Sequence, residues 1–171
     1  AIALSETVSE KEQAYISALS SRYDGNIESN RDPLDIAYAN AMEKLSKTFP
    51  DDNDAASLFA EALMNTMPWN YWAEDGDPKP DTIKVIDSLE NVLAKNPNHP
   101  LAIHLYIHAV EASSNPGRAE GPADRLGKIV PGAGHLVHMP AHIYWRIGRY
   151  HDASLVNIEA AKVDEDYIAQ C

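Results

Sequence analysis

The sequence predicts an all-α protein, and three observations support this fold class. Ala, Leu, Glu and Lys, which are strong helix formers, recur in blocks of about 12 to 16 residues. Gly, Pro, Asn and Asp separate the blocks, as they do at turns. No stretch alternates polar and apolar residues for long, as a half-exposed strand would. With 171 residues, 44% of them hydrophobic, the chain has the size and core of one domain or a short repeat array.

Eight helical blocks follow one another, each with apolar residues at helical spacing. Leu19 lies on the apolar stripe of the first block and Ile83 on that of the fourth. We expect Asp32 to cap the second block before Pro33, and Asp54 and Asp81 to begin the third and fourth. The blocks are expected at about residues 5–23, 32–49, 54–66, 81–95, 100–113, 116–130, 135–147 and 150–168.

The turns between the blocks recur at a fixed period. Pro97 and Pro131 each end a block and lie 34 residues apart. Pro50 lies 47 residues before Pro97, and removing a 13-residue insertion at 69–81 restores the period of 34. Two helices per period predict stacked helix–turn–helix units, which bury their apolar faces only against one another.

The segment 144–153, YWRIGRYHDA, followed by Ala160, resembles a tetratricopeptide repeat (TPR). The resemblance implies a right-handed α-solenoid of TPR-like helix pairs with about eight helices. It also implies that Gly148 lies at the turn within the last pair, and that Tyr150, Ala153 and Ala160 are packing positions of its second helix.

The TPR resemblance covers most of the chain as a single array. The implied repeat pairs are residues 5–48, 54–95, 99–130 and 134–168, with an aromatic insert at 67–80. Segments 104–111 and 131–140 are similar to those of bacterial TPR proteins of unassigned function, a similarity that implies no activity. Pro140 departs from the pattern, because it should kink the first helix of the last pair or delay its start.

Four histidines form two pairs at helical spacing. His104 and His108 lie four residues apart, as do His138 and His142, so each pair shares a helix face. The two pairs are 34 residues apart and occupy positions five and nine of consecutive repeats. The resemblance implies that these positions line the concave groove of the array.

Imidazoles at this spacing can chelate a metal ion, and helices packed about 8 to 10 Å apart would bring two such pairs together. The sequence therefore predicts a metal site formed by some subset of His104, His108, His138 and His142. Imidazole ligands favour zinc, copper or nickel over magnesium or calcium. In the alternative interpretation, the histidines only hydrogen-bond neighbours in a polar groove that captures a peptide.

The same register implies further groove residues. His135 lies on the groove side, and Glu111 and Trp145 share position twelve. Glu111 and Glu61 could supply an oxygen ligand or orient an imidazole from behind. Arg146 could bind a carboxylate or phosphate, or pair with an acidic neighbour.

The insert carries three large aromatic residues close together, Trp69, Tyr71 and Trp72. One interpretation is a hydrophobic anchor for a long loop. The other is a lid or wall over the groove that presents flat faces to a ligand.

Composition and motifs exclude several classes of function. The net charge of −12 argues against nucleic acids and anionic membrane surfaces as partners, and no apolar run approaches the length of a membrane helix. The single cysteine, Cys171, excludes an internal disulfide and a Cys-rich zinc site. Signatures of zinc peptidases, serine hydrolases and P-loop nucleotide-binding proteins are absent.

Three hypotheses for function remain. The first is a TPR module whose groove binds a peptide, a protein or a small molecule. The second is a metal-binding protein that uses the same groove, and the third is a metal-dependent hydrolase with Glu111 as base. We expect a fragment of a longer soluble bacterial protein, cytoplasmic or periplasmic, or self-association through an uncapped end.

Overall fold

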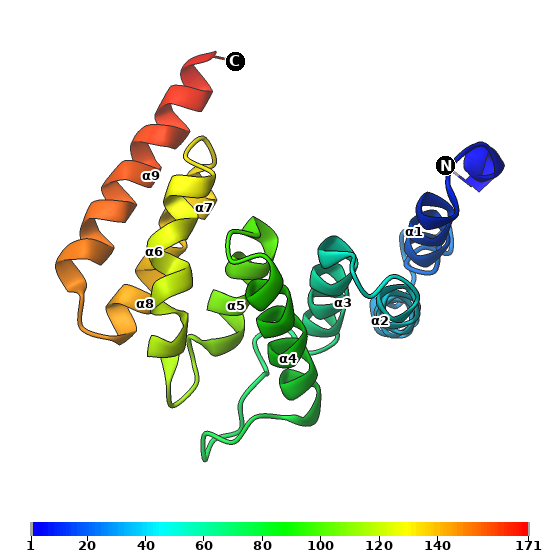
Figure 1. The fold of residues 1–171 in the computed structure, drawn as a ribbon, viewed down its shortest axis with the longest axis horizontal. Coiled ribbons are helices and arrows are strands. Elements are labelled where there is room, and N and C mark those ends of the chain that lie inside the picture. The colour runs from blue at the N-terminus through cyan, green and yellow to red at the C-terminus, as the bar shows by residue number, and fades with distance from the viewer. Residues whose placement is uncertain (1, 171) are drawn as a thin grey trace. The chain divides into compact units, whose positions relative to one another are not determined.

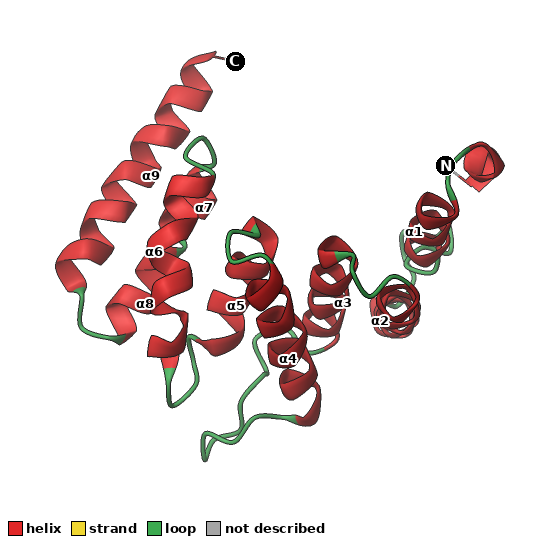
Figure 2. Ribbon diagram, in the orientation of Figure 1, coloured by secondary structure: helices red, strands yellow, loops and turns green. Residues whose placement is uncertain are grey.

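The computed structural model describes residues 2–170, so Cys171 lies outside the described residues (Figure 1). All regular structure in this part of the chain is helical, and Figure 2 shows helices joined by loops. A single isolated bridge joins Trp72 to Pro78. The helices are η1 (Ile2–Thr7), α1 (Glu10–Ser20), α2 (Arg31–Thr48), α3 (Asn53–Thr66), α4 (Pro80–Lys95), α5 (Pro100–Val110), η2 (Pro116–Ala119), α6 (Glu120–Ile129), α7 (Gly134–His138), α8 (Pro140–Arg146) and α9 (Tyr150–Gln170).

The chain divides into two compact units, residues 1–71 and 72–171. In the first unit α1 packs on α2 and α2 on α3, around a core that includes Tyr38, Met42 and Leu45. On α1 the buried position is Ala18, whereas Leu19, predicted on the apolar stripe, is 48% exposed. Across residues 2–170, each helix is too short or too polar to span a bilayer.

Two helices of the first unit begin earlier than predicted, because an earlier side chain caps each of them. The Asn30 side chain accepts a hydrogen bond from the backbone N–H of Asp32 at 3.1 Å, so Asp32 lies inside α2. Asp52 likewise accepts from the backbone of Asp54 at 3.1 Å and caps α3. These oxygens satisfy backbone donors that the first helical turn leaves without partners.

The fourth helix also starts before its predicted cap. α4 begins at Pro80, which needs no partner for a backbone N–H, and Asp81 lies in the first turn. Ile83 was predicted to be part of the apolar stripe but is 48% exposed, while Val85 and Leu89 are buried.

In the second unit each helix from α4 onward packs against a neighbour in the chain, and α5 also packs against α8. The core is formed by fully buried apolar side chains of α4 to α8, among them Leu89, Ile103, Ile107, Leu126 and Ile143. This core fixes the positions of α5, α7 and α8. These three helices carry the clustered histidines.

The block predicted at residues 135–147 is interrupted, as the position of Pro140 indicated. α7 ends at His138 and α8 begins at Pro140, with the buried Met139 between them. Pro140 has no N–H to continue the backbone ladder of α7. The block predicted at 116–130 is likewise divided, into η2 and α6.

The structure places three of the four residues singled out near the last turn and helix at a turn or in the core, which does not by itself identify the family. Gly148 has φ of 85°, a left-handed conformation that suits glycine in a tight turn. Ala153 and Ala160 are the buried residues of α9. Tyr150, expected as a large packing residue, is instead 63% exposed.

A candidate metal centre of clustered histidines

Five imidazoles gather where α5, α7 and α8 meet in the second unit. The centroids of neighbouring rings lie between 4.9 and 6.5 Å apart. We call this group the histidine cluster, and its members are His104 and His108 of α5, His135 and His138 of α7, and His142 of α8. The cluster contains both predicted pairs together with His135.

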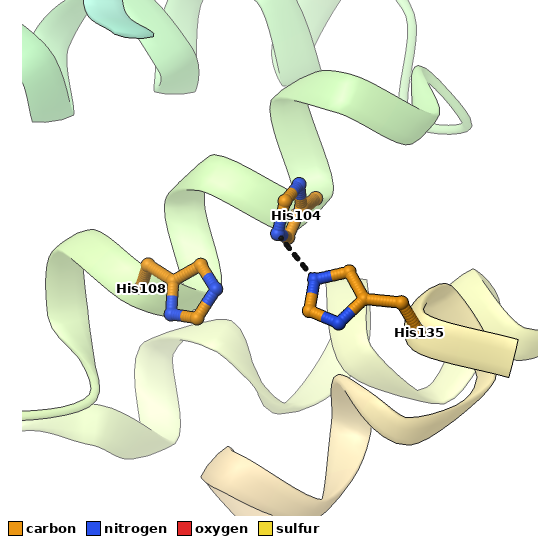
Figure 3. Close-up of side chains that lie close together, drawn as sticks. All are labelled: His104, His108 and His135. Atoms are coloured by element: carbon orange, nitrogen blue, oxygen red, sulfur yellow. Dashed lines mark hydrogen bonds between the residues drawn. The ribbon is translucent and has the colours of Figure 1, made fainter. Parts of the chain in front are cut away.

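Three members of the cluster converge in Figure 3 and form what we call the histidine triad, His104, His108 and His135. Each offers a ring nitrogen, and these atoms all lie within 4.8 Å of one another. Nε2 of His135 lies 3.1 Å from Nε2 of His104. His135 is predicted from the sequence as a groove residue and not as a metal ligand, so the triad differs from the predicted ligand set.

Glu111, at the end of α5, contacts two of the histidines through its two carboxylate oxygens. Oε1 lies 3.1 Å from Nδ1 of His108, and Oε2 lies 2.7 Å from Nδ1 of His142. A carboxylate only accepts hydrogen bonds, so both imidazoles carry a hydrogen on Nδ1. In the neutral form of each ring, Nε2 then holds the lone pair that a metal requires. The three residues form a second group in which ligand atoms lie within 4.8 Å of one another.

Burial and repulsion from neighbouring imidazoles favour the neutral form of two members of the triad, His104 and His135. Burial and the neighbouring imidazoles lower the pKa of His104 to about 4. The pKa of His135 is also lowered, mainly by burial, although the charge of Asp164 acts in the opposite direction. Both rings are therefore unprotonated at neutral pH, the state that coordinates metal.

The Glu111 carboxylate is the buried anion of the cluster, at 9% exposure. Burial by itself would raise its pKa, but hydrogen bonds from His108 and His142 outweigh burial and bring the pKa down to about 2. The carboxylate is thus ionised over the whole physiological pH range and balances cationic charge placed among the imidazoles.

The remaining two members, which we call the histidine pair, are His138 and His142. Their Nε2 atoms lie 3.0 Å apart. Nδ1 of His138 lies 2.5 Å from Oδ1 of Asn157 on α9. The Asn157 amide nitrogen donates to the carbonyl of Ala153 at 2.9 Å, which orients the amide so that its oxygen faces the imidazole.

A hollow of about 360 Å³ borders the histidine pair. Both histidines of the pair line it, together with Glu111, Ala141, Trp145, Arg146, Ala153 and Asn157. The Arg146 guanidinium carbon lies 5.7 Å from the centre of the Trp145 ring, and Trp145 is 62% exposed. Trp145 and Arg146, both predicted as groove residues, therefore line the hollow beside the histidine pair.

One residue of the aromatic insert, Trp72, is bonded as the anchor interpretation predicts. Nε1 of Trp72 donates to the carbonyl oxygen of Ala109 at 2.8 Å, satisfying an acceptor in the last turn of α5. Trp69 and Tyr71 belong to the first unit, where Trp69 is 72% exposed and Tyr71 is buried. Glu61, on α3, also belongs to the first unit, whereas the cluster is formed by the second.

Two residues of α9, Asn157 and Asp164, lie beside the cluster, and no pattern in the sequence predicts this position for either of them. Asn157 holds His138, as described above. Asp164 lies against the first residue of α7, since a Cβ atom on Gly134 would be 2.0 Å from its Oδ1. The packing of α9 on α7 and α8 brings them there.

Searches against protein-family models, curated proteins and solved structures found no match to this chain. The geometry of the histidine cluster therefore carries the functional argument.

Proposed function

We propose that this chain is a TPR-like binding protein whose histidine triad binds a divalent transition metal, with zinc, copper and nickel as the candidate ions. The observation that carries the proposal is the convergence of three imidazole nitrogens from α5 and α7 within 4.8 Å of one another. Glu111 supports it, because its hydrogen bond to Nδ1 of His108 leaves Nε2 as the coordinating atom.

The distances within the triad suit one bound ion. Two nitrogens that each lie about 2.1 Å from a tetrahedral metal are about 3.4 Å apart. Nε2 of His104 and Nε2 of His135 already lie 3.1 Å apart, so a small adjustment brings both into coordination. Three protein ligands leave a fourth position open for water or another ligand, as in catalytic and transport sites.

The α-solenoid and its concave groove are part of the same proposal. α5 and α7 begin at Pro100 and Gly134, 34 residues apart, which is the period of the predicted repeat. The contact between α5 and α8 is the one that first helices of consecutive repeats would make. In this arrangement the hollow beside Arg146 and Trp145 lies in the groove and takes a small ligand or the side chain of a peptide.

Calorimetric titration of chelator-treated protein with Zn(II), Cu(II) and Ni(II) tests the proposal. We expect binding at micromolar concentration or tighter, weakened at least 100-fold in the His104→Ala/His135→Ala variant. His151→Ala is the matched control, since His151 is exposed on α9 and outside the cluster. Absence of binding by all three metals, or equal weakening in the control, would overturn the proposal.

A further inference from the structure

The histidine pair lies outside the triad, and its hydrogen-bonding pattern is incomplete. Nδ1 of His138 faces the amide oxygen of Asn157, and Nδ1 of His142 faces the carboxylate of Glu111. Both oxygens are acceptors, so the hydrogen of each neutral imidazole resides on Nδ1. Each Nε2 therefore presents a lone pair.

These two lone pairs lie opposite each other. The Nε2 atoms of His138 and His142 are 3.0 Å apart, and two neutral rings with hydrogen on Nδ1 have no hydrogen to place between them. Two acceptors at this distance repel unless a cation lies between them or beside both. A metal that binds both nitrogens at about 2.1 Å satisfies the two lone pairs at once, with an N–metal–N angle near 90°.

Space for the rest of a coordination shell lies on one side of the pair. The hollow of about 360 Å³ is lined by both imidazoles and by Asn157, so a metal there would have access to water and small oxygen ligands. Glu111 connects the pair to the triad, because its Oε1 contacts His108 while its Oε2 contacts His142. One carboxylate therefore orients a ligand of each group.

We propose that His138 and His142 form a second metal position, distinct from the triad, which takes the same class of divalent transition ion and leaves coordination sites open to the hollow. The proposal rests on the proposed function only in the choice of ion. It gives the cluster two metal positions that share the buried Glu111 carboxylate. A neutral imidazole has one lone pair, so each of the five histidines serves one position only.

Metal stoichiometry tests this inference. Chelator-treated protein is titrated with Zn(II), and the bound metal is also counted by elemental analysis after gel filtration. We expect two ions per chain for the wild type and for His151→Ala. We expect one ion for His138→Ala/His142→Ala, and one for His104→Ala/His135→Ala. Circular dichroism of each variant establishes that it is folded.

A milder variant keeps all five imidazoles. Asn157→Leu removes the acceptor that holds Nδ1 of His138. We expect the affinity of one of the two ions to fall about 10- to 100-fold, with the other unchanged. Equal affinities in Asn157→Leu and the wild type would contradict the inference.

The outcomes separate the two proposals. A single ion that is lost with the triad and retained without the pair overturns the second position and leaves the proposed function intact. A nitrogen NMR spectrum showing a proton shared between His138 and His142 in zinc-saturated protein would also overturn the second position and leave the proposed function intact. A single ion that is lost with the pair and retained without the triad supports the second position and overturns the proposed triad site. No bound ion overturns both.

Discussion

Oε2 of Glu111 lies 2.7 Å from Nδ1 of His142, although the two residues are 31 positions apart in the chain. The other carboxylate oxygen contacts His108 on the same helix as Glu111. One ionised side chain thereby links α5 to α8 and selects the tautomer of two imidazoles.

Replacement of Glu111 by Gln should impair metal binding while preserving shape. The amide oxygen can accept from only one of the two Nδ1–H groups, so the other imidazole must move its hydrogen to Nε2 and lose its coordinating lone pair. We expect affinity for Zn(II) to fall about 10- to 100-fold in calorimetric titration. Glu165→Gln, at an exposed position of α9, is the control. Unchanged affinity in Glu111→Gln would show that the carboxylate has no part in binding.

The metal-free protein should lose stability in mild acid because of His104. Its pKa is about 4 in the folded state against the ordinary value of 6.5, so between these pH values only the unfolded chain binds the proton. The free energy of unfolding is therefore complete above pH 6.5 and decreases as pH falls towards 4. After allowance for partial solvent exposure, we expect a loss of about 1 to 2 kcal/mol.

Urea denaturation of chelator-treated protein at several pH values measures this loss. His104→Gln has no titrating ring and should show a flatter dependence between pH 6.5 and 4.5. Glu111, with a pKa of about 2 against an ordinary 4.5, adds its own loss only below about pH 4.5, so the two effects are separable. An identical pH dependence in the variant and the wild type would rule out His104 as the cause.

The effect of replacing Gly134 on the free energy of unfolding should depend on the side chain at position 164. A Cβ atom on Gly134 would lie 2.0 Å from Oδ1 of Asp164, so Gly134→Ala must displace that side chain. Alanine is otherwise preferred to glycine in a helix. We expect Gly134→Ala to be neutral or destabilising in the wild type and stabilising by about 0.5 kcal/mol in Asp164→Ala. Urea denaturation of the four proteins of this cycle measures the coupling, and additive effects would contradict it.

Trp72→Phe tests the role of the aromatic insert. The variant keeps an aromatic ring but loses the N–H that donates to the carbonyl of Ala109, and we expect the second unit to lose about 1 kcal/mol of stability. Trp145→Phe, at a side chain that is 62% exposed, should change stability by less than about 0.5 kcal/mol. Thermal denaturation measures both. Unaltered stability together with weaker ligand binding in Trp72→Phe would favour the lid interpretation.

The sequence predicted most helical segments but fewer of their starts, for a local reason. The block expected at 5–23 was wrong as one helix, because Ser9 caps α1 and separates it from η1. Helical periodicity persists over many residues, whereas a helix start depends on which of several Asn or Asp residues caps it. At α2 and α3 an earlier residue, Asn30 or Asp52, is the cap. The break at Pro140 followed directly from proline chemistry, so it was predictable.

The candidate site was predictable where it depends on helical spacing within each histidine pair and on the 34-residue period that relates the two pairs, since the rings of His108 and His142 do lie together, with centroids 5.2 Å apart. The i, i+4 spacing places His104 and His108 on one face, and their rings do lie together, with centroids 4.9 Å apart. Which imidazole of a neighbouring helix each ring contacts depends on tertiary packing. Nε2 of His135 on α7 lies 3.1 Å from Nε2 of His104 on α5, a contact that the spacing of the two pairs does not specify. Asn157, from α9, has no pattern in the sequence that relates it to the histidines.

The junction at Met139 allows mutation of a residue outside the histidine pair to change the geometry of that pair. On α5 the spacing of the histidines is set by helical pitch, but the bite distance of the His138–His142 chelate is set by the angle between two short helices. Met139 is fully buried between them. A change of volume at this core position, remote from any ion, can therefore alter the chelate geometry and with it the preference between tetrahedral and square-planar metals.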